Sequence, residues 1–321
     1  MAGYCTDWNG QGQSGNPWPG SGMLYTMENA PFEFAFADYI LAPKTLYNIG
    51  GPARWALLPR TASQVEQAYD WMMAQDAPRL ILGGGSNMLI QDEGFPGVVL
   101  LMTELNDMAS LDYHRYSVGA GVELDTMVRE IMLPNNYDVV GGLTGIPGSV
   151  GGAIYMNAGT VNGSTCQLLE SVDVLKADGV KTIAMKEDLY DYRGQSFCAP
   201  GEIILSGTFQ FTPAEKDQQA IYDHYKKRRI EKQPQGHCCG SVFKNPEGDH
   251  AGRLIEACGL KGTRHGGAII SSMHANFIMN DDNASSDDVL FLIDMAKRTV
   301  LETHGVVLEE EVQIFPKHNA V

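Results

Sequence analysis

Two segments of the chain are so rich in glycine that backbone, not side chains, must form the surface there. Gly83-Gly84-Gly85-Ser86-Asn87 follows the apolar run Leu80–Leu82, and the segment from Gly141 to Ala153 holds six glycines in thirteen residues. Without a Cβ, successive backbone N–H groups in such a loop can surround phosphate oxygens. Either segment alone could be no more than a tight turn. Because there are two, we expect them to hold one extended ligand.

Neither segment has the spacing of the common nucleotide fingerprints. A GxGxxG motif beginning at Gly83 would need glycine where Met88 stands, and no GxxxxGK[ST] motif occurs anywhere in the chain. The sequence therefore disfavours both a Rossmann fold and a P-loop.

The charge and the apolar pattern exclude several classes of protein. With 39 acidic and 23 basic residues the net charge is -16, which does not suit a protein that binds nucleic acid through a basic face. No apolar run approaches the roughly 18 residues of a membrane span. The first 43 residues lack Lys and Arg, so the basic start of a secretory signal is missing, and we expect a cytoplasmic protein. The six cysteines are irregularly spaced, which predicts reduced thiols, with Cys198 and Cys258 buried.

The pattern along the chain predicts an α+β architecture. Residues 1–30 form a glycine-rich arm without hydrophobic periodicity, which we expect to be flexible. Helices are predicted from Ser63, with a Ser63/Glu66 capping box, and over 221–232 and 286–304, the last ending at Gly305. Strands are predicted over 80–82, 98–102 and 116–118, and as a hairpin of 172–175 with 181–184 around Asp178-Gly179.

Five motifs, in order and at matching separations, carry a resemblance to a known family. They are Tyr47-Asn48-Ile49-Gly50-Gly51-Pro52-Ala53, Gly83–Asn87, Gly145–Ala153, Gly240-Ser241-Val242-Phe243-Lys244-Asn245-Pro246 and Leu308-Glu309-Glu310-Glu311-Val312. From about Ala42 to Phe315 the chain resembles the UDP-N-acetylenolpyruvoylglucosamine reductases, also called UDP-N-acetylmuramate dehydrogenases. The resemblance implies NADPH-dependent, FAD-mediated reduction of UDP-N-acetylglucosamine enolpyruvate in peptidoglycan precursor synthesis.

The resemblance also implies a domain plan and a cofactor site. An FAD-binding domain of the vanillyl-alcohol-oxidase type would span residues 31–212, in lobes of about 31–102 and 103–212, and an α+β substrate-binding domain would span 213–317. FAD would be bound non-covalently, with its pyrophosphate on the first glycine loop and its flavin along the second. The cofactor-binding residues would be Gly50, Gly83, Gly84, Gly85, Ser86, Asn87, Met88, Thr144, Gly145, Gly148, Ser149, Gly151, Gly152, Ala153 and Ile203.

Three residues match the catalytic groups of that family. Ser241, between a glycine and a bulky pair, matches its proton-donating serine, Arg193 its arginine beside the substrate carboxylate, and Glu311 its catalytic carboxylate. A planar guanidinium suits a carboxylate because it binds it with a fixed, permanently charged fork. Without the resemblance, Ser241 could be a turn residue, Arg193 a solvated charge, and Glu309, Glu310 and Glu311 one solvated face. A Ser-His-Asp nucleophile is disfavoured because no GxSxG elbow is present.

Further residues would bind the substrate. Tyr192, Lys232 and Asn245 match family positions for this role, and Lys232 ends a basic run of Lys226, Lys227, Arg228 and Arg229 that fits a nucleotide diphosphate. The short connection from Tyr192 to Gly201 resembles the family form without an extra tyrosine-bearing loop. The family more often has Thr and a basic residue where Leu46 and Asn48 stand, and a serine one position earlier than Ser196.

Two other functions remain to be weighed, and no metal is expected. A flavin oxidase acting on an alcohol or sugar would release hydrogen peroxide, but such enzymes often tether flavin through a histidine, and none precedes His114. A non-catalytic nucleotide-binding protein would require loss of Ser241, Arg193 or Glu311. His237, Cys238 and Cys239 do not have the spacing of a zinc site. We expect His274 to be a packed, structural histidine and the protein to be a monomer.

Overall fold

The computed structural model describes residues 4–5 and 31–316. These residues divide into two compact units that are not continuous in sequence. Unit 1 comprises the residues up to Ala37, Arg54–Gly84 and Pro96–Arg228, and unit 2 comprises Asp38–Ala53, Gly85–Phe95 and the residues from Arg229 on. Two N-terminal segments are therefore grouped with the C-terminal part in unit 2. Apart from Tyr4–Cys5, the predicted flexible arm lies outside the described residues.

The first sheet belongs mainly to unit 1 and has the strand order β1-β4-β6-β3-β2. Its strands are β1 (Tyr4–Cys5), β2 (Ala35–Ile40), β3 (Pro52–Leu57), β4 (Arg79–Leu82) and β6 (Phe95–Leu101). β4 and β6 pair in parallel, and both are apolar and largely buried, as expected of a strand covered on both faces. The predicted strand 98–102 ends one residue early because Met102 begins a 3₁₀ turn, Met102–Glu104.

Helix α1 (Ala62–Met73) supplies Val65, Ala68, Tyr69 and Met72 to the same buried core as this sheet. The predicted Ser63/Glu66 capping box is wrong. Thr61 is the N-cap, and its hydroxyl accepts a hydrogen bond from the backbone N–H of Gln64. Thr61 and Ser63 are both good cap residues, and the helix begins at the earlier of the two.

The second sheet of unit 1 is antiparallel, in the order β12-β11-β15-β8-β7. Its strands are β7 (Met108–Ser110), β8 (Arg115–Gly119), β11 (Leu169–Lys176), β12 (Gly179–Ala184) and β15 (Ile203–Gln210). The predicted hairpin is confirmed as β11 with β12, and Gly179 has the positive φ of 99° that its tight turn requires.

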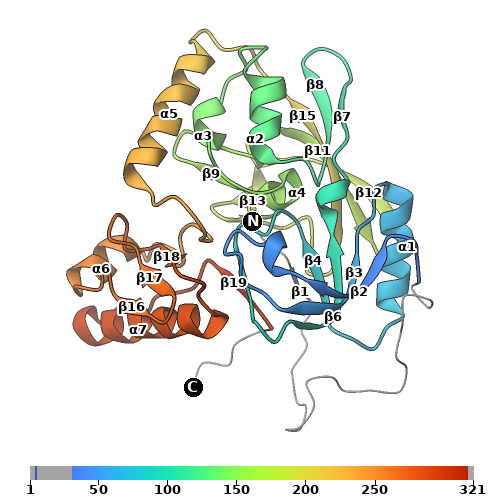
Figure 1. Ribbon diagram of the computed structural model, residues 1–321. Coiled ribbons are helices and arrows are strands. Elements are labelled where there is room, and N and C mark those ends of the chain that lie inside the picture. Colours follow the sequence, from blue (N-terminus) through green and yellow to red (C-terminus); the bar gives the residue numbers. More distant parts are fainter. Residues whose placement is uncertain (1–3, 6–30, 317–321) are drawn as a thin grey trace. The chain divides into compact units, whose positions relative to one another are not determined.

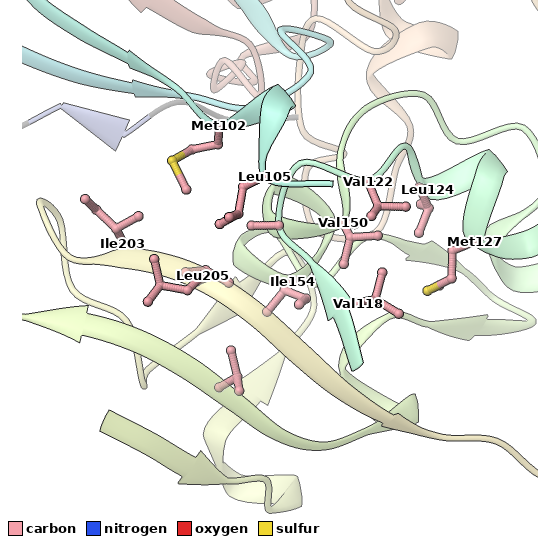
Figure 2. Packing of buried hydrophobic residues seen from close by; sticks show 14 of the residues in the cluster. Met102, Leu105, Val118, Val122, Leu124, Met127, Val150, Ile154, Ile203 and Leu205 are labelled. Carbon is pink, nitrogen blue, oxygen red and sulfur yellow. The ribbon is translucent and has the colours of Figure 1, made fainter. Parts of the chain in front are cut away.

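Short helices and ribbons complete unit 1. The helices are α2 (Leu124–Met127), continued by a π-helical turn over Val128–Met132, α3 (Val140–Leu143) and α4 (Val150–Tyr155). Two small ribbons pair β9 (Gly159–Thr160) with β10 (Gly163–Ser164) and β13 (Tyr190–Asp191) with β14 (Gly194–Gln195). Figure 2 shows residues of α2 and α4 packed with residues of β8 and β15. Because Gly207 has no side chain, β15 and α4 can pack closely. A Cβ at Gly207 would be 3.0 Å from Ile154 Cδ1 of α4.

Unit 2 contains a three-stranded antiparallel sheet of β16 (Arg264–His265), β17 (Ala268–Ile270) and β18 (Ile278–Asn280), with helices α6 (Ala251–Ala257) and α7 (Ser286–His304) (Figure 1). Helix α7 has the predicted bounds. Ser285 and Asp288 form a capping box at its start, and Gly305 ends it in the left-handed conformation. A second, parallel pair joins β5 (Met88–Ile90) to β19 (Gln313–Phe315), from opposite ends of the chain.

Helix α5 (Gln218–Lys232) begins in unit 1 and ends in unit 2. Among the described residues, no helix is long and apolar enough to span a bilayer. The five cysteines whose side chains are described are free thiols, as predicted. Cys198 is buried, but the prediction of a buried Cys258 is wrong. Its side chain is half-buried, with Sγ 3.8 Å from the Thr299 carbonyl oxygen of α7.

Candidate active site

The two glycine loops meet in unit 1, at the end of β4. A Cβ on Gly83 would be 2.4 Å from Ser149 Oγ, and one on Gly84 would be 2.8 Å from Gly148 Cα. Such distances are too short for any real side chain, so backbone faces backbone between the loops. The two segments that the sequence singled out therefore form one continuous glycine-lined wall.

The second loop leads into α4. Gly145 and Gly148 have positive φ values of 66° and 116°, and Ser149 caps α4 by accepting a hydrogen bond from Gly152 N–H. The N–H of Gly151 donates to Ala120 O and that of Ala153 to Ser149 O, so these two donors are engaged within the protein. A Cβ on Gly151 would be 2.7 Å from that of Ala120. Gly151 is thus required by packing, while Gly145 and Gly148 shape the exposed part of the loop.

Thr144 and Ile203 are buried in unit 1. The Thr144 hydroxyl donates to Val140 O (2.8 Å). The Ile203 side chain is fully buried and lies near Leu205 and Met102 in the core (Figure 2). Because that side chain is part of the core, Ile203 can contact a cofactor only through its backbone.

The remaining part of the first loop belongs to unit 2. Gly85 has φ +60°, and a Cβ there would be 1.9 Å from Lys44 O. Its carbonyl accepts the N–H of Leu46 (3.0 Å), and Gly50, with φ +144°, packs against Ile90. Ser86, Asn87 and Met88 follow, all buried, with Met88 starting β5. The first glycine loop therefore continues from unit 1 into a tightly packed turn of unit 2.

Asn87 connects this loop to the predicted catalytic glutamate. Its side-chain amide donates to Glu311 O (2.8 Å), and its own carbonyl accepts the N–H of Gln313 (2.9 Å). The pattern that marked Asn87 as cofactor-binding gave no sign of this role. It holds the backbone of Glu311 at a fixed place relative to the loop.

The segment that carries Ser241 lies between two other segments of unit 2. Val242 N–H donates to Asn276 O (2.9 Å), and Val242 O accepts the N–H of Glu311 (2.8 Å). The side chain of Asn276, buried in the His274–Asn280 block, holds Phe243 from both sides, accepting its N–H (2.9 Å) and donating to its carbonyl (2.8 Å). Ser241 and Glu311, 70 positions apart in sequence, are thereby brought to adjacent backbone, and both side chains are half-buried.

The three adjacent glutamates have different surroundings. Glu309 lies 3.4 Å from Lys244 Nζ, and Glu310 lies 2.7 Å from Lys297 Nζ. Glu311 instead lies close to the thiol of Cys239. Burial, together with the nearby Glu311 carboxylate, raises the pKa of Cys239 to about 12. Glu311 thus differs from Glu309 and Glu310, whose carboxylates pair with Lys244 and Lys297.

Arg193 is at the tip of the β13–β14 ribbon in unit 1. It has a positive φ of 60°, which is uncommon for a residue with a long side chain. Its Nη1 donates to Gly159 O (3.2 Å), and its guanidinium carbon lies 5.1 Å from the centre of the Tyr192 ring, which is 69% exposed. The ribbon thus presents a half-buried guanidinium and an exposed aromatic ring side by side, which suits a planar anion attached to a larger group.

The other predicted substrate residues are exposed in unit 2. Lys232 is the last residue of α5. Asn245 accepts the N–H of Ala251 at the start of α6 (3.1 Å), so its side-chain oxygen already has a structural partner. His274 is half-buried, its Nδ1 accepts Asn276 N–H, and burial lowers its pKa, as expected of a packed, neutral histidine.

Three residues that support the site were not singled out from the sequence. Asn276 clamps Phe243, Tyr47 contacts Cys239, and Cys239 in turn lies beside Glu311. Tyr47 falls within a motif that resembles the family, but the partners of Tyr47 and Asn276 are distant in sequence. No local pattern reports such contacts.

The residues present fit FAD. The backbone of Gly83-Gly84 lies too close to Gly148-Ser149 for side chains, and the half-buried Gly84 and Gly148 are glycines of the kind that let backbone approach a pyrophosphate. FAD would be held here by backbone groups of both loops.

Comparison with known proteins identifies the family of the chain. Residues 53–183 match the model of an FAD-binding domain, and residues 232–315 match that of the UDP-N-acetylenolpyruvoylglucosamine reductase C-terminal domain. The UDP-N-acetylenolpyruvoylglucosamine reductase of Thermotoga maritima is 39% identical over 282 residues, which is 86% of this chain and 96% of that protein. That of Synechococcus sp. (strain WH7803) is 36% identical over 281 residues, 85% of this chain and 90% of the relative.

A solved structure of a reductase with the same name is also similar to this chain. The crystal structure of UDP-N-acetylenolpyruvylglucosamine reductase from Thermus caldophilus has a TM-score of 0.73 and 34% sequence identity, covering 88% of this chain and 98% of that one. The predicted α+β fold with an N-terminal FAD-binding domain is confirmed. The chain belongs to the UDP-N-acetylenolpyruvoylglucosamine reductase family.

Proposed function

We propose that this protein is an FAD-dependent oxidoreductase that reduces UDP-N-acetylglucosamine enolpyruvate to UDP-N-acetylmuramate in peptidoglycan synthesis, with NADPH as the electron donor. One observation carries the proposal beyond family membership. The segments of Ser241 and Glu311 are hydrogen-bonded to each other, and Glu311 is hydrogen-bonded to the glycine loop through Asn87. A proton donor and a carboxylate are thus fixed to the loop that would bind the cofactor.

The substrate sets the chemical requirement. Its enolpyruvyl ether has a terminal vinyl carbon and an inner carbon that bears a carboxylate. When bound, FAD supplies the hydride that saturates the terminal carbon. Negative charge then develops on the inner carbon and its carboxylate as an enolate, and it must be met by preorganised positive or hydrogen-bonding groups. Completing the reaction requires one proton at the inner carbon.

We assign these tasks to three residues. Arg193 pairs with the substrate carboxylate and stabilises the charge that develops there. Ser241 donates the proton from its Oγ, and Glu311, in its protonated form, donates a hydrogen bond on the carboxylate side. Loss of a positioned proton donor costs about 10²- to 10⁴-fold in rate.

Other residues would hold the rest of the substrate. Lys232 at the end of α5 carries a cation that suits the diphosphate, and exposed Tyr192 and Asn245 suit contacts with the sugar or the nucleotide. We also propose that the protein works in the cytoplasm as a monomer, and its net charge of -16 argues against a nucleic-acid partner.

Product analysis tests this function. The protein, loaded with FAD, is incubated with NADPH and UDP-N-acetylglucosamine enolpyruvate. We expect one NADPH oxidised for each product molecule, and mass spectrometry should show a product that has gained two hydrogen atoms. Oxidation of NADPH with release of hydrogen peroxide and no change in the enolpyruvyl compound would instead identify an oxidase.

A further inference from the structure

Tyr47 is a buried residue whose hydroxyl reaches the segment that carries Ser241. Its side chain is fully buried in unit 2, and the Cys239 thiol donates a hydrogen bond to its hydroxyl oxygen, with Sγ and Oη 3.5 Å apart. The two residues are 192 positions apart in sequence. A buried hydroxyl is costly without a hydrogen-bond partner, and a phenylalanine ring would fill the same space. The hydroxyl therefore needs an explanation besides packing.

Both partners of this contact remain uncharged at neutral pH. Burial, aided by the nearby Cys239, raises the pKa of Tyr47 well above its ordinary value, and burial also raises the pKa of Cys239. Tyr47 and Cys239 therefore add no negative charge beside Glu311. They are a fixed pair of neutral dipoles rather than a titrating switch.

One end of the contact is tied to the glycine loop. Leu46, next to Tyr47, donates its N–H to Gly85 O (3.0 Å). The carbonyl of Tyr47 accepts a hydrogen bond from the side chain of Asn280 in β18 (2.9 Å). Hydrogen bonds at Leu46 N–H and at the Tyr47 carbonyl therefore hold the backbone of Tyr47 in place.

The other end is tied to the proton donor. Cys239 precedes Ser241 by two residues, and Gly240 between them has φ +81° with open space around it. A glycine in such surroundings allows many backbone conformations. The side chain of Cys239 is therefore the last fixed point before Ser241, and Tyr47 fixes it.

We propose that Tyr47 is a positioning residue whose hydroxyl, through the Cys239 thiol, sets the place of Ser241 relative to the loop Gly85–Asn87. The role rests on the proposed function, because it assumes that Ser241 is the proton donor. It predicts a specific effect on the second half of the reaction, the oxidation of reduced flavin by the enolpyruvyl substrate. The first half, reduction by NADPH, does not use Ser241.

The test is Tyr47→Phe in the full chain loaded with FAD, which removes only the hydroxyl. We expect the FAD dissociation constant and the rate of reduction by NADPH to change less than twofold, and reoxidation by the substrate to slow about tenfold, the effect of losing one modest hydrogen bond. Tyr137→Phe is the matched control. Tyr137 is also a buried tyrosine whose hydroxyl has a partner, His114 Nδ1 at 2.8 Å, but it lies in the core of unit 1. It should lower the melting temperature without changing either half reaction.

Variants of Cys239 show whether the contact itself matters. Cys239→Ala should slow reoxidation as Tyr47→Phe does, the double variant should be no slower than either single one, and Cys239→Ser should recover most of the rate. Independently of activity, the infrared S–H stretching band of one thiol should shift in Tyr47→Phe. Unchanged reoxidation in Tyr47→Phe, or additive losses in the double variant, would overturn the positioning role alone. A wild-type protein that the substrate does not reoxidise would overturn the proposed function as well.

Discussion

In the proposed mechanism the chemistry depends most on Ser241. This half-buried residue follows Gly240, which has a positive φ, while the next two residues are held by Asn276 and by the Glu311 segment. A hydroxyl is a weak acid at neutral pH, so its value as a donor depends on being held at the right atom with a polarising neighbour.

For Ser241→Ala we expect bound FAD that NADPH still reduces at the normal rate, and substrate-driven reoxidation slowed by about 10² to 10⁴. Only the proton donor is missing, so the step before protonation is intact. Anaerobic stopped-flow absorbance of the flavin separates the two steps. Reoxidation at the wild-type rate would remove Ser241 from this role.

The adjacent residues Glu309, Glu310 and Glu311 allow the proposed role of Glu311 to be compared with that of its neighbours. Glu311→Ala should slow reoxidation about 10²-fold, because it removes the hydrogen-bond donor assigned to the substrate carboxylate. Glu309→Ala and Glu310→Ala should stay within twofold, since those side chains pair with Lys244 and Lys297. The same stopped-flow assay, run on all three variants, decides whether Glu311 is correctly singled out. An equal loss at Glu310 would contradict the assignment.

At the scale of elements, the turns and caps explain why these loops and helices form where they do. Gly85 combines a left-handed φ with a backbone oxygen 1.9 Å from its missing Cβ, whereas Gly179 has a positive φ but open space around it. Gly85 is required by both its backbone conformation and its packing, whereas Gly179 is required by its conformation alone. Substitutions at the two positions therefore distinguish backbone strain from steric overlap.

Gly85→Ala should lower the free energy of unfolding by more than the roughly 1 to 3 kcal/mol of backbone strain and should weaken FAD binding. Gly179→Ala should show the strain alone and leave FAD binding unchanged. Urea unfolding followed by circular dichroism measures the first quantity, and flavin fluorescence titration measures the second. If both variants bound FAD as tightly as the wild type, the loop Gly85–Asn87 would not belong to the cofactor site.

Helix α7 provides a prediction for stability without a change of activity. Ser285 accepts the N–H of Asp288 and caps the helix. Ser285→Ala should cost about 1 kcal/mol of unfolding free energy and leave turnover unchanged. Urea unfolding and steady-state NADPH oxidation test the two halves of this expectation, and a loss of turnover at unchanged stability would contradict it.

Elements whose signals are local were predictable from the sequence. Helix α7 has its cap at Ser285, an apolar face including Val289 and Ile293, and its stop at Gly305, all within one stretch. For α1 the local signal is ambiguous, because Thr61 and Ser63 are both good cap residues, and the structure uses Thr61. The half-burial of Cys258 was also missed, because burial depends on elements that pack from elsewhere in the chain.

At the scale of the whole molecule, the contacts that complete the site join the two ends of the sequence. Asn87 meets Glu311 at a separation of 224 residues, Tyr47 meets Cys239 at 192, and β5 pairs with β19. The family resemblance gives candidate catalytic residues, but no spacing or periodicity predicts which residues hold them in place. For the same reason, the grouping of residues 38–53 and 85–95 with the C-terminal part could not be read from a linear sequence.

The central claim is that reduced flavin on this protein gives its electrons to an enolpyruvyl group. Anaerobic stopped-flow absorbance of the FAD-loaded protein, reduced with one equivalent of NADPH and then mixed with UDP-N-acetylglucosamine enolpyruvate, tests it most directly. We predict that the flavin absorbance lost with NADPH returns fully when the enolpyruvyl compound is added. Absorbance that stays bleached until oxygen is admitted would contradict the account.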